Sequence, residues 1–210
     1  MTAIRGVISD FGGVLTSPLL DAFAALQGPE GVPLDALGRA MATTAEARGA
    51  HPLFELEKGR ISEADFLSDL QRGLEAELGR PVELTSLGQA FFEHLEPNDE
   101  MFAFYRDLRD RGLHMALLTN NVREWEPLWR SMLPVDEVFN VVVDSGFVGM
   151  RKPEPEIYEL TLERIGLRAE ACVFVDDQDV NCEAARQLGI TPVQFRTTEQ
   201  AIAELEAVLG

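Results

Sequence analysis

Short apolar runs of about strand length recur along the chain and alternate with longer segments of helical periodicity. Each of the five runs reads as a buried strand, and they span residues 4–9, 114–118, 140–143, 171–175 and 192–195. Helical segments that end at a glycine lie between the later runs, at residues 99–111, 154–165 and 180–188. A last helix is expected from about Thr198, whose hydroxyl group can cap it. This alternation predicts an α/β fold, a Rossmann-like parallel sheet covered by helices on both faces.

The long interval between the first two predicted strands has a different pattern. Residues 18–97 contain no convincing strand, and the segment from Ser62 to Asp65 resembles a helix capping box. Leucines follow at helical spacing at positions 67, 70, 74 and 78. Because the interval is too long for one crossover connection, we expect a helical subdomain inserted after the first strand.

Composition limits the classes of function. The 210 residues include 36 acidic and 18 basic residues, a formal net charge of −18, and 46% hydrophobic residues, enough for a full core. An acidic surface repels phosphate backbones and anionic lipids, so we expect no nucleic-acid partner and no membrane partner. The sequence has no apolar run of membrane-spanning length, no signal-peptide pattern and only two cysteines, and together these favour a cytoplasmic location.

Polar residues follow the predicted strands where each strand ends. Asp10 follows the first strand, Thr119 and Asn120 follow the second, and Asp176 and Asp177 follow the run at 171–175. In open α/β sheets ligands bind beyond the carboxyl ends of the strands. Each residue alone has an ordinary structural explanation, such as a helix cap or a turn, but those explanations do not predict that all of them meet at one edge.

One lysine precedes a predicted helix at the same edge. The chain has only two lysines, Lys58 and Lys152, beside 16 arginines. With Lys152 as a compact positive charge, the set suits phosphoryl transfer. Asp10 is a carboxylate nucleophile able to form an aspartyl-phosphate, and Asp10 and Asp177 are hard oxygen ligands for Mg²⁺. Thr119 can hold phosphoryl oxygens.

Four short motifs carry a resemblance to a known family. They are Asp10-Phe-Gly-Gly-Val, Leu-Leu-Thr119-Asn, Lys152-Pro and Val-Phe-Val-Asp176-Asp177, in this order. The sequence resembles the haloacid dehalogenase (HAD) superfamily, in particular the branch with sugar-phosphate phosphatases and the N-terminal phosphatase domain of soluble epoxide hydrolases. The insertion lies where that family has its C1 cap. The resemblance implies a core of residues 1–16 and 96–210 and a helical cap of residues 17–95.

The resemblance also implies a role for each matching residue. Asp10 would be the nucleophile and a metal ligand, together with the backbone carbonyl group of Gly12 and the carboxylate of Asp177. Thr119, Asn120 and Lys152 would bind the phosphoryl group, and Lys152 would also fix Asp10. Two further residues, Asp176 and Asn181, would orient the metal's waters.

The inserted segment is expected to select the substrate. The stretch from Phe54 to Ser62 resembles the cap of the same branch, and its residues Phe54, Glu57, Lys58 and Arg60 are expected to face the site. The tryptophans Trp125 and Trp129, four residues apart after the second motif, are expected to pack in the core or at an interface rather than to form a substrate platform.

One departure from the family pattern keeps three functions open. Family phosphatases usually have a second aspartate two residues after the nucleophile as general acid and base, and here that position is Gly12. The first hypothesis is a Mg²⁺-dependent phosphatase of small phosphorylated metabolites. It would favour substrates whose leaving group departs easily, such as sugar 1-phosphates. The alternatives are a metal-independent 2-haloacid dehalogenase and a catalytically weakened phosphate-binding protein. Both a monomer and a homodimer are compatible with the sequence.

Overall fold

The computed structural model describes residues 3–18, 32–84 and 87–210, and its centre is a five-stranded parallel sheet. The strands are β1 (Gly6–Ser9), β2 (His114–Thr119), β3 (Val141–Asp144), β4 (Cys172–Asp176) and β5 (Thr191–Gln194). Their order in the sheet is β3-β2-β1-β4-β5, and every pair is parallel. The predicted α/β class is therefore confirmed, and all five strands lie within two residues of their predicted positions.

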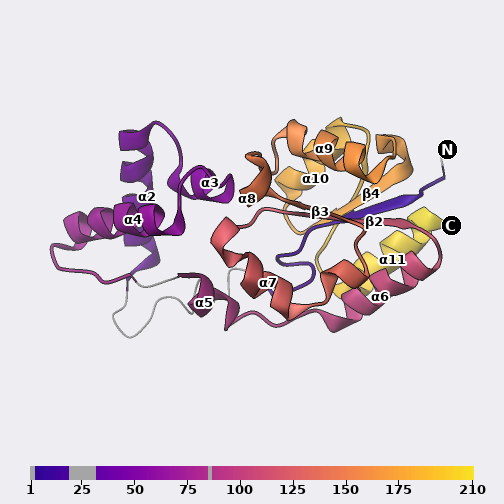
Figure 1. The fold of residues 1–210 in the computed structure, drawn as a ribbon, viewed down its shortest axis with the longest axis horizontal. Coiled ribbons are helices and arrows are strands. Elements are labelled where there is room, and N and C mark those ends of the chain that lie inside the picture. Colours follow the sequence, from indigo (N-terminus) through magenta and orange to yellow (C-terminus); the bar gives the residue numbers. More distant parts are fainter. Residues whose placement is uncertain (1–2, 19–31, 85–86) are drawn as a thin grey trace.

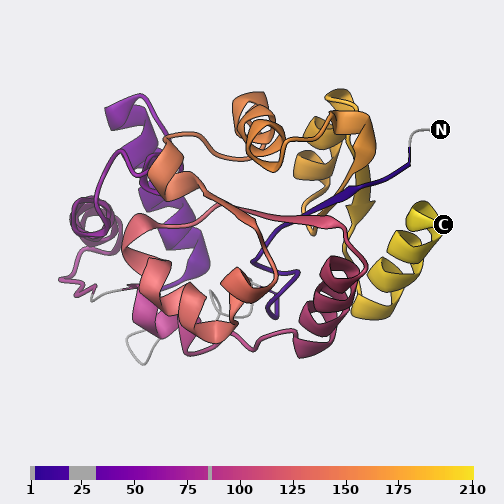
Figure 2. The ribbon, with the colours of Figure 1, turned by 45° about the vertical axis from the view of Figure 1, so that its right-hand side comes forward.

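Helices cover both faces of this sheet (Figures 1 and 2). Alternate strand residues point to opposite faces, so Val7 of β1 packs in one cluster and Ile8 in another. The first face is covered by α6 (Asp99–Asp110), α7 (Glu126–Met132) and α11 (Thr198–Leu209). The second face is covered by α9 (Pro155–Ile165) and α10 (Asp179–Gln187). Short connections complete the core, namely α8 (Ser145–Val148) and three 3₁₀ turns at Arg123–Trp125, Val135–Glu137 and Ala169–Ala171.

The last helix begins at Thr198 as predicted, but a different residue caps it. We predicted that the Thr198 hydroxyl would cap it, but the N-cap is Thr197, whose side chain accepts a hydrogen bond from the backbone N–H of Gln200. The Gln200 side chain binds back to the N-cap backbone, which completes a capping box. The Thr198 hydroxyl contacts the Asn98 side chain instead, at 2.9 Å.

A group of helices leaves the core after β1, and we call its described residues, 32–84 and 87–95, the cap. It contains α2 (Leu34–Arg48), α3 (Pro52–Glu57), α4 (Glu63–Leu78) and α5 (Leu87–Phe92). The chain leaves and re-enters the core side by side, because Thr16 and Pro97 form an antiparallel bridge. Residues 19–31 of the predicted insertion lie outside the described residues. Ser62 caps α4 by accepting a hydrogen bond from the Asp65 N–H.

The cap has its own apolar interior. Leu56, Phe66, Leu70 and Leu74 are buried together with Trp125, which comes from the core. In the described part of the chain, no helix combines the length and the apolar character that a membrane crossing requires.

Candidate active site

The predicted site residues converge at the carboxyl edge of the sheet. Asp10 follows β1 directly, Thr119 is the last residue of β2, and Asp176 is the last residue of β4. Lys152 comes from the loop between α8 and α9, and its side chain is buried, with 1% exposed. Because neighbouring parallel strands end at the same edge, residues that are far apart in the sequence meet here.

The Lys152 ammonium group lies between two carboxylates. Its Nζ atom is 2.8 Å from Oδ1 of Asp10 and 2.7 Å from Oδ2 of Asp176. All three side chains are buried. A buried charge is stable only when it is paired and hydrogen-bonded, so this lysine and these two acids depend on one another.

Both carboxylate oxygens of Asp176 have protein partners. In addition to Lys152, Asp176 accepts hydrogen bonds from the Asn181 side chain, at 3.0 and 3.2 Å, and from the Gln178 backbone N–H, at 2.8 Å. Tyr158 in turn donates to the backbone carbonyl group of Asn181. Asp176 and Asn181 therefore hold Lys152 in place, and their expected action on metal-bound waters stays a prediction.

Three carboxylates fit a divalent cation. Each of Asp10, Asp176 and Asp177 offers one oxygen, and these oxygens lie within 4.8 Å of one another. The Asp10 hydrogen bonds to described residues, from Lys152 and from the Phe11 N–H, both use Oδ1, which leaves Oδ2 for another ligand. Mg²⁺ needs only one or two carboxylates besides water and backbone oxygens, so the donor set fits this ion.

A glycine makes room for the acidic group. Gly13 has a φ of +77°, and a Cβ atom on it would lie 2.8 Å from Oδ2 of Asp177. An L-residue here would adopt a strained backbone and displace that carboxylate. Gly13 therefore allows Asp177 to approach the turn after Asp10.

The electrostatics of the edge also favour a cation. Burial, opposed by Lys152 and reinforced by Asp176, raises the pKa of Asp10 to about 8. Burial also raises the pKa of Asp177. Burial alone would lower the pKa of Lys152, but Asp10 and Asp176 together raise it, so the lysine stays charged. One lysine cannot neutralise three acids, and a divalent cation would favour their ionised forms.

The two residues after β2 behave differently from each other. Thr119 is buried at the edge, with 1% exposed, and lines the pocket described below. The Asn120 side chain binds the Lys152 backbone twice, accepting from its N–H at 2.8 Å and donating to its carbonyl group at 3.0 Å. Asn120 thus positions the lysine loop, and its contact with a phosphoryl group stays a prediction.

Three of the four predicted cap residues, Phe54, Lys58 and Arg60, lie beside the pocket rather than on its wall. Phe54 is 40% exposed and packs against the Arg151 guanidinium group, 4.0 Å from the ring centre. Lys58 forms ion pairs with Glu154 and Glu55. Arg60 pairs with Glu55 and donates to the backbone carbonyl group of Gly149. Glu57 lines the pocket, and its Oε2 atom is 2.6 Å from Nε of Arg151. Substrate contacts of these cap residues stay predictions.

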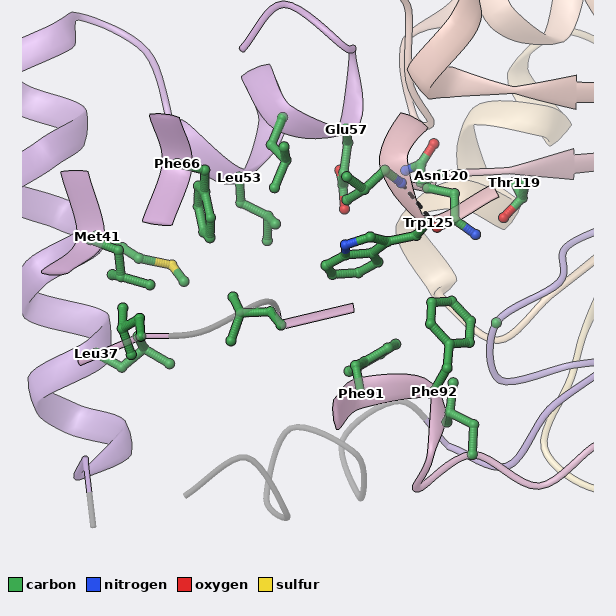
Figure 3. A pocket seen from close by; sticks show the side chains of 18 of the residues that line it. Leu37, Met41, Leu53, Glu57, Phe66, Phe91, Phe92, Thr119, Asn120 and Trp125 are labelled. Atoms are coloured by element: carbon green, nitrogen blue, oxygen red, sulfur yellow. Dashed lines mark hydrogen bonds between the residues drawn. The ribbon is translucent and has the colours of Figure 1, made fainter. Parts of the chain in front are cut away.

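A pocket of about 190 Å³ lies between the cap and the carboxyl edge (Figure 3). Gly12, Thr119 and Asn120 line it on the core side. Apolar cap side chains form most of the remaining wall, among them Leu37, Met41, Leu53, Phe66 and Phe91. The pocket therefore joins the carboxyl edge to the apolar interior of the cap.

Three contacts near the pocket were not found by sequence reasoning. Trp125 lines the pocket, whereas Trp129 packs against Phe11 in the core as expected. The Ser145 hydroxyl donates to the backbone carbonyl group of Glu57, at 2.6 Å, and Arg151 pairs with the Glu57 side chain. The partners in these cap–core contacts are 88 and 94 positions apart, so no local pattern indicates them.

The sheet, the buried lysine between two aspartates and the helical cap define an α/β protein of the capped hydrolase class. The family model described as haloacid dehalogenase-like hydrolase matches residues 4–189. The chain belongs to this family and is a hydrolase, which confirms the resemblance carried by the four motifs.

Individual relatives agree with this family. The chain is 31% identical to Phosphatase MT3486 of Mycobacterium tuberculosis, over 90% of this chain and 85% of that protein. It is also 31% identical to mouse acyl-CoA dehydrogenase family member 10, over 98% of this chain. That match spans only 19% of the mouse protein, and the chain covers 39% or less of the mammalian epoxide hydrolases that it also matches.

A solved structure shows the same fold. The HAD family enzyme bt-2542 of Bacteroides thetaiotaomicron, solved with magnesium and inorganic phosphate, superposes with a TM-score of 0.65. The two chains are 23% identical, and the match covers 92% of this chain and 94% of the other. This likeness supports the arrangement of the sheet and its insertion.

Proposed function

We propose that this hydrolase is a Mg²⁺-dependent phosphatase of small phosphate monoesters, acting through an aspartyl-phosphate on Asp10. The observation that carries the proposal is the Lys152 ammonium group, held between Asp10 and Asp176 beside a third carboxylate, Asp177. A phosphatase relative of nearly the same length supports it.

In the first step an Asp10 carboxylate oxygen attacks phosphorus. The new bond joins Asp10 to phosphorus, and the bond between phosphorus and the alcohol oxygen breaks. Lys152 fixes the Asp10 carboxylate and adds positive charge beside the transferring group, and Thr119 offers a hydroxyl group for a phosphoryl oxygen. Asp10, Asp177 and the Gly12 carbonyl group would hold Mg²⁺, which when bound neutralises the developing charge on phosphoryl oxygens.

In the second step a water molecule attacks phosphorus in the aspartyl-phosphate, which releases inorganic phosphate and restores Asp10. Gly12 has no side chain that could donate a proton, so the alkoxide that departs in the first step takes its proton from solvent. General acid–base assistance typically contributes about 10²–10⁴-fold, and turnover at a lower rate is compatible with its loss. Substrates with easily departing groups are favoured for the same reason.

A panel of phosphate monoesters tests the proposal. We expect phosphate release with Mg²⁺, loss of release in EDTA, and recovery when Mg²⁺ is restored. Sugar 1-phosphates belong in the panel because their leaving group departs easily. Release that is unchanged in EDTA, or no release from any ester or acyl phosphate, would contradict the proposal.

Gly12 is also compatible with a second function, dehalogenation. A dehalogenase needs no general acid, since the Asp10 carboxylate would attack carbon and halide would leave unprotonated. Asp176 and Asp177 would have no metal to serve in that reaction, so their presence beside Asp10 favours the phosphatase. Halide release from 2-haloacids in EDTA would establish the dehalogenase instead. Ligand binding without either activity would indicate a phosphate-binding protein.

A further inference from the structure

The wall of the cap pocket is almost entirely hydrocarbon. Among the described residues that line the pocket, Glu57 is the only one with an ionisable side chain. Its carboxylate is paired with Arg151, and its side chain is only 17% exposed. The other polar lining residues, Thr119, Asn120 and Asn121, belong to the carboxyl edge. No free charged group therefore faces the cap end of the described pocket.

Aromatic rings form one side of the same pocket. Trp125 stacks on Phe91, with ring centres 5.6 Å apart and an interplanar angle of 28°, and Phe92 meets it edge-on at 5.9 Å. The three side chains come from the core and from α5, and Figure 3 shows them beside the apolar cap residues. Such a wall is well suited to an aliphatic chain or a ring.

The polarity of this pocket disfavours a sugar. A buried hydroxyl group without a hydrogen-bond partner is unfavourable, and a sugar would bring several of them to the cap end. The Trp125 indole N–H is the one polar group there that donates to no described residue. A single donor cannot satisfy a ring of hydroxyl groups.

The size of the pocket limits the ligand. An apolar cavity of about 150 Å³ holds benzene, and this pocket has about 190 Å³. One ring or a chain of about six to eight carbon atoms is therefore the largest group that fits with the described side chains in place.

We propose that the cap pocket binds the apolar alcohol portion of the substrate, so that the enzyme acts on phosphate monoesters of aliphatic or aromatic alcohols. The inference rests on the proposed phosphatase function, because it places the phosphoryl group at Asp10 and Thr119. The pocket lining selects by hydrophobic burial, and the carboxyl edge fixes the phosphate.

Titration calorimetry with alkylphosphonates tests the inference without requiring hydrolysis. The full chain with Mg²⁺ is titrated with methyl-, butyl-, hexyl- and octylphosphonate. We expect Kd to fall by about threefold to fourfold per methylene group and to level off once the pocket is full. Inorganic phosphate should displace the longer ligands, because both occupy the same edge.

A variant of the cap places the effect in the pocket. Met41 lines the pocket on α2, and Thr43 on the same helix is exposed and does not line it. Met41→Gln should weaken octylphosphonate binding by about fivefold to tenfold and leave methylphosphonate unchanged. Thr43→Gln introduces the same group and should change neither Kd. Melting temperatures of both variants verify that they fold.

The outcomes separate this inference from the proposed function. A Kd that does not depend on chain length, or tighter binding of a sugar phosphate than of octylphosphonate, would overturn the apolar pocket even if the enzyme releases phosphate. Chain-length-dependent binding that phosphate displaces, without hydrolysis of any ester, would support the pocket and contradict the phosphatase proposal.

Discussion

The carboxyl edge and the cap pocket are neighbours with opposite construction. At the edge, Lys152 binds Asp10 and Asp176, Asn181 binds Asp176, and Asn120 binds the lysine backbone. In the cap pocket the wall is held by apolar contacts, which impose no directional requirement. The positions of the side chains at the edge are thus fixed by directional hydrogen bonds and ion pairs, whereas the wall of the cap pocket is defined by shape and burial.

The same comparison predicts where substitutions are tolerated. Removing one partner from a buried charged network leaves the others uncompensated. Exchanging apolar side chains of similar volume usually costs less than about 1.5 kcal/mol. The edge should therefore be intolerant of single changes, and the cap pocket should accept exchanges that alter specificity.

The largest effect should come from Asp10→Asn. The amide keeps the shape of the side chain but is a poor nucleophile and carries no charge, so kcat should fall by at least about 10³-fold. Phosphate release measures the loss, and circular dichroism verifies the fold. Activity within about tenfold of the unmodified enzyme would show that another group attacks phosphorus.

The next effect compares the two lysines. Lys152→Met leaves Asp10 and Asp176 buried without their cation, and the free energy of unfolding should fall by about 3–5 kcal/mol. Lys58 of the cap pairs with Glu55 and Glu154, which lie nearer to solvent. Lys58→Met should therefore lower the free energy of unfolding by about 1 kcal/mol or less. Urea unfolding measures both.

Equal losses for the two lysine variants would contradict the contrast between the edge and the cap. It would mean that the Lys152 pairs contribute no more than an ion pair close to the surface. A loss of activity in the Lys152 variant at temperatures where it remains folded would add a role in positioning Asp10.

A smaller effect concerns the metal site. Gly13→Ala would push a methyl group against Asp177, and the Mg²⁺ concentration for half-maximal activity should rise by about 10–100-fold. Gly112→Ala is the matched control, because Gly112 also has a positive φ, +91°, but a Cβ atom there meets nothing within 4 Å. Both variants should lose similar stability through backbone strain.

An unchanged Mg²⁺ requirement in Gly13→Ala would indicate that Asp177 does not bind the metal. A similar shift in Gly112→Ala would show that general destabilisation, and not contact with the carboxylate, causes the effect.

The smallest predicted effect concerns the ion pair that joins the two regions. Glu57 and Arg151 connect the cap to the loop before α9. A double-mutant cycle with Glu57→Gln and Arg151→Gln should give a coupling energy of about 1 kcal/mol in urea unfolding. A coupling energy indistinguishable from zero would mean that the pair does not stabilise the contact between cap and core.

The core and its edge could be predicted from the sequence because their signals are local. Each strand is a short apolar run, and Asp10, Thr119 and Asp176 follow or end these runs directly. Parallel strands with helical crossovers bring such residues to one edge. The different partners of Asp176 and Asp177 are harder to predict from the sequence, because only the packed structure shows that Asp176 faces Lys152.

The cap pocket could not be predicted in the same way. Its wall combines Met41, Phe66 and Phe91 of the cap with Trp125 of the core, and their spacing in the sequence has no fixed period. Leucine spacing at positions 67–78 predicts a helix but not which neighbours its apolar face meets. Trp125 was expected to pack, and it does so while also lining the pocket.

The most direct measurement is chemical trapping of the covalent intermediate. The enzyme is mixed with Mg²⁺ and an acyl phosphate, quenched, and reduced with borohydride, which converts an aspartyl-phosphate to homoserine. Mass spectrometry of the peptides should find homoserine at position 10 alone, and none when EDTA is present. Homoserine at another aspartate, or no conversion during active turnover, would contradict Asp10 as the nucleophile.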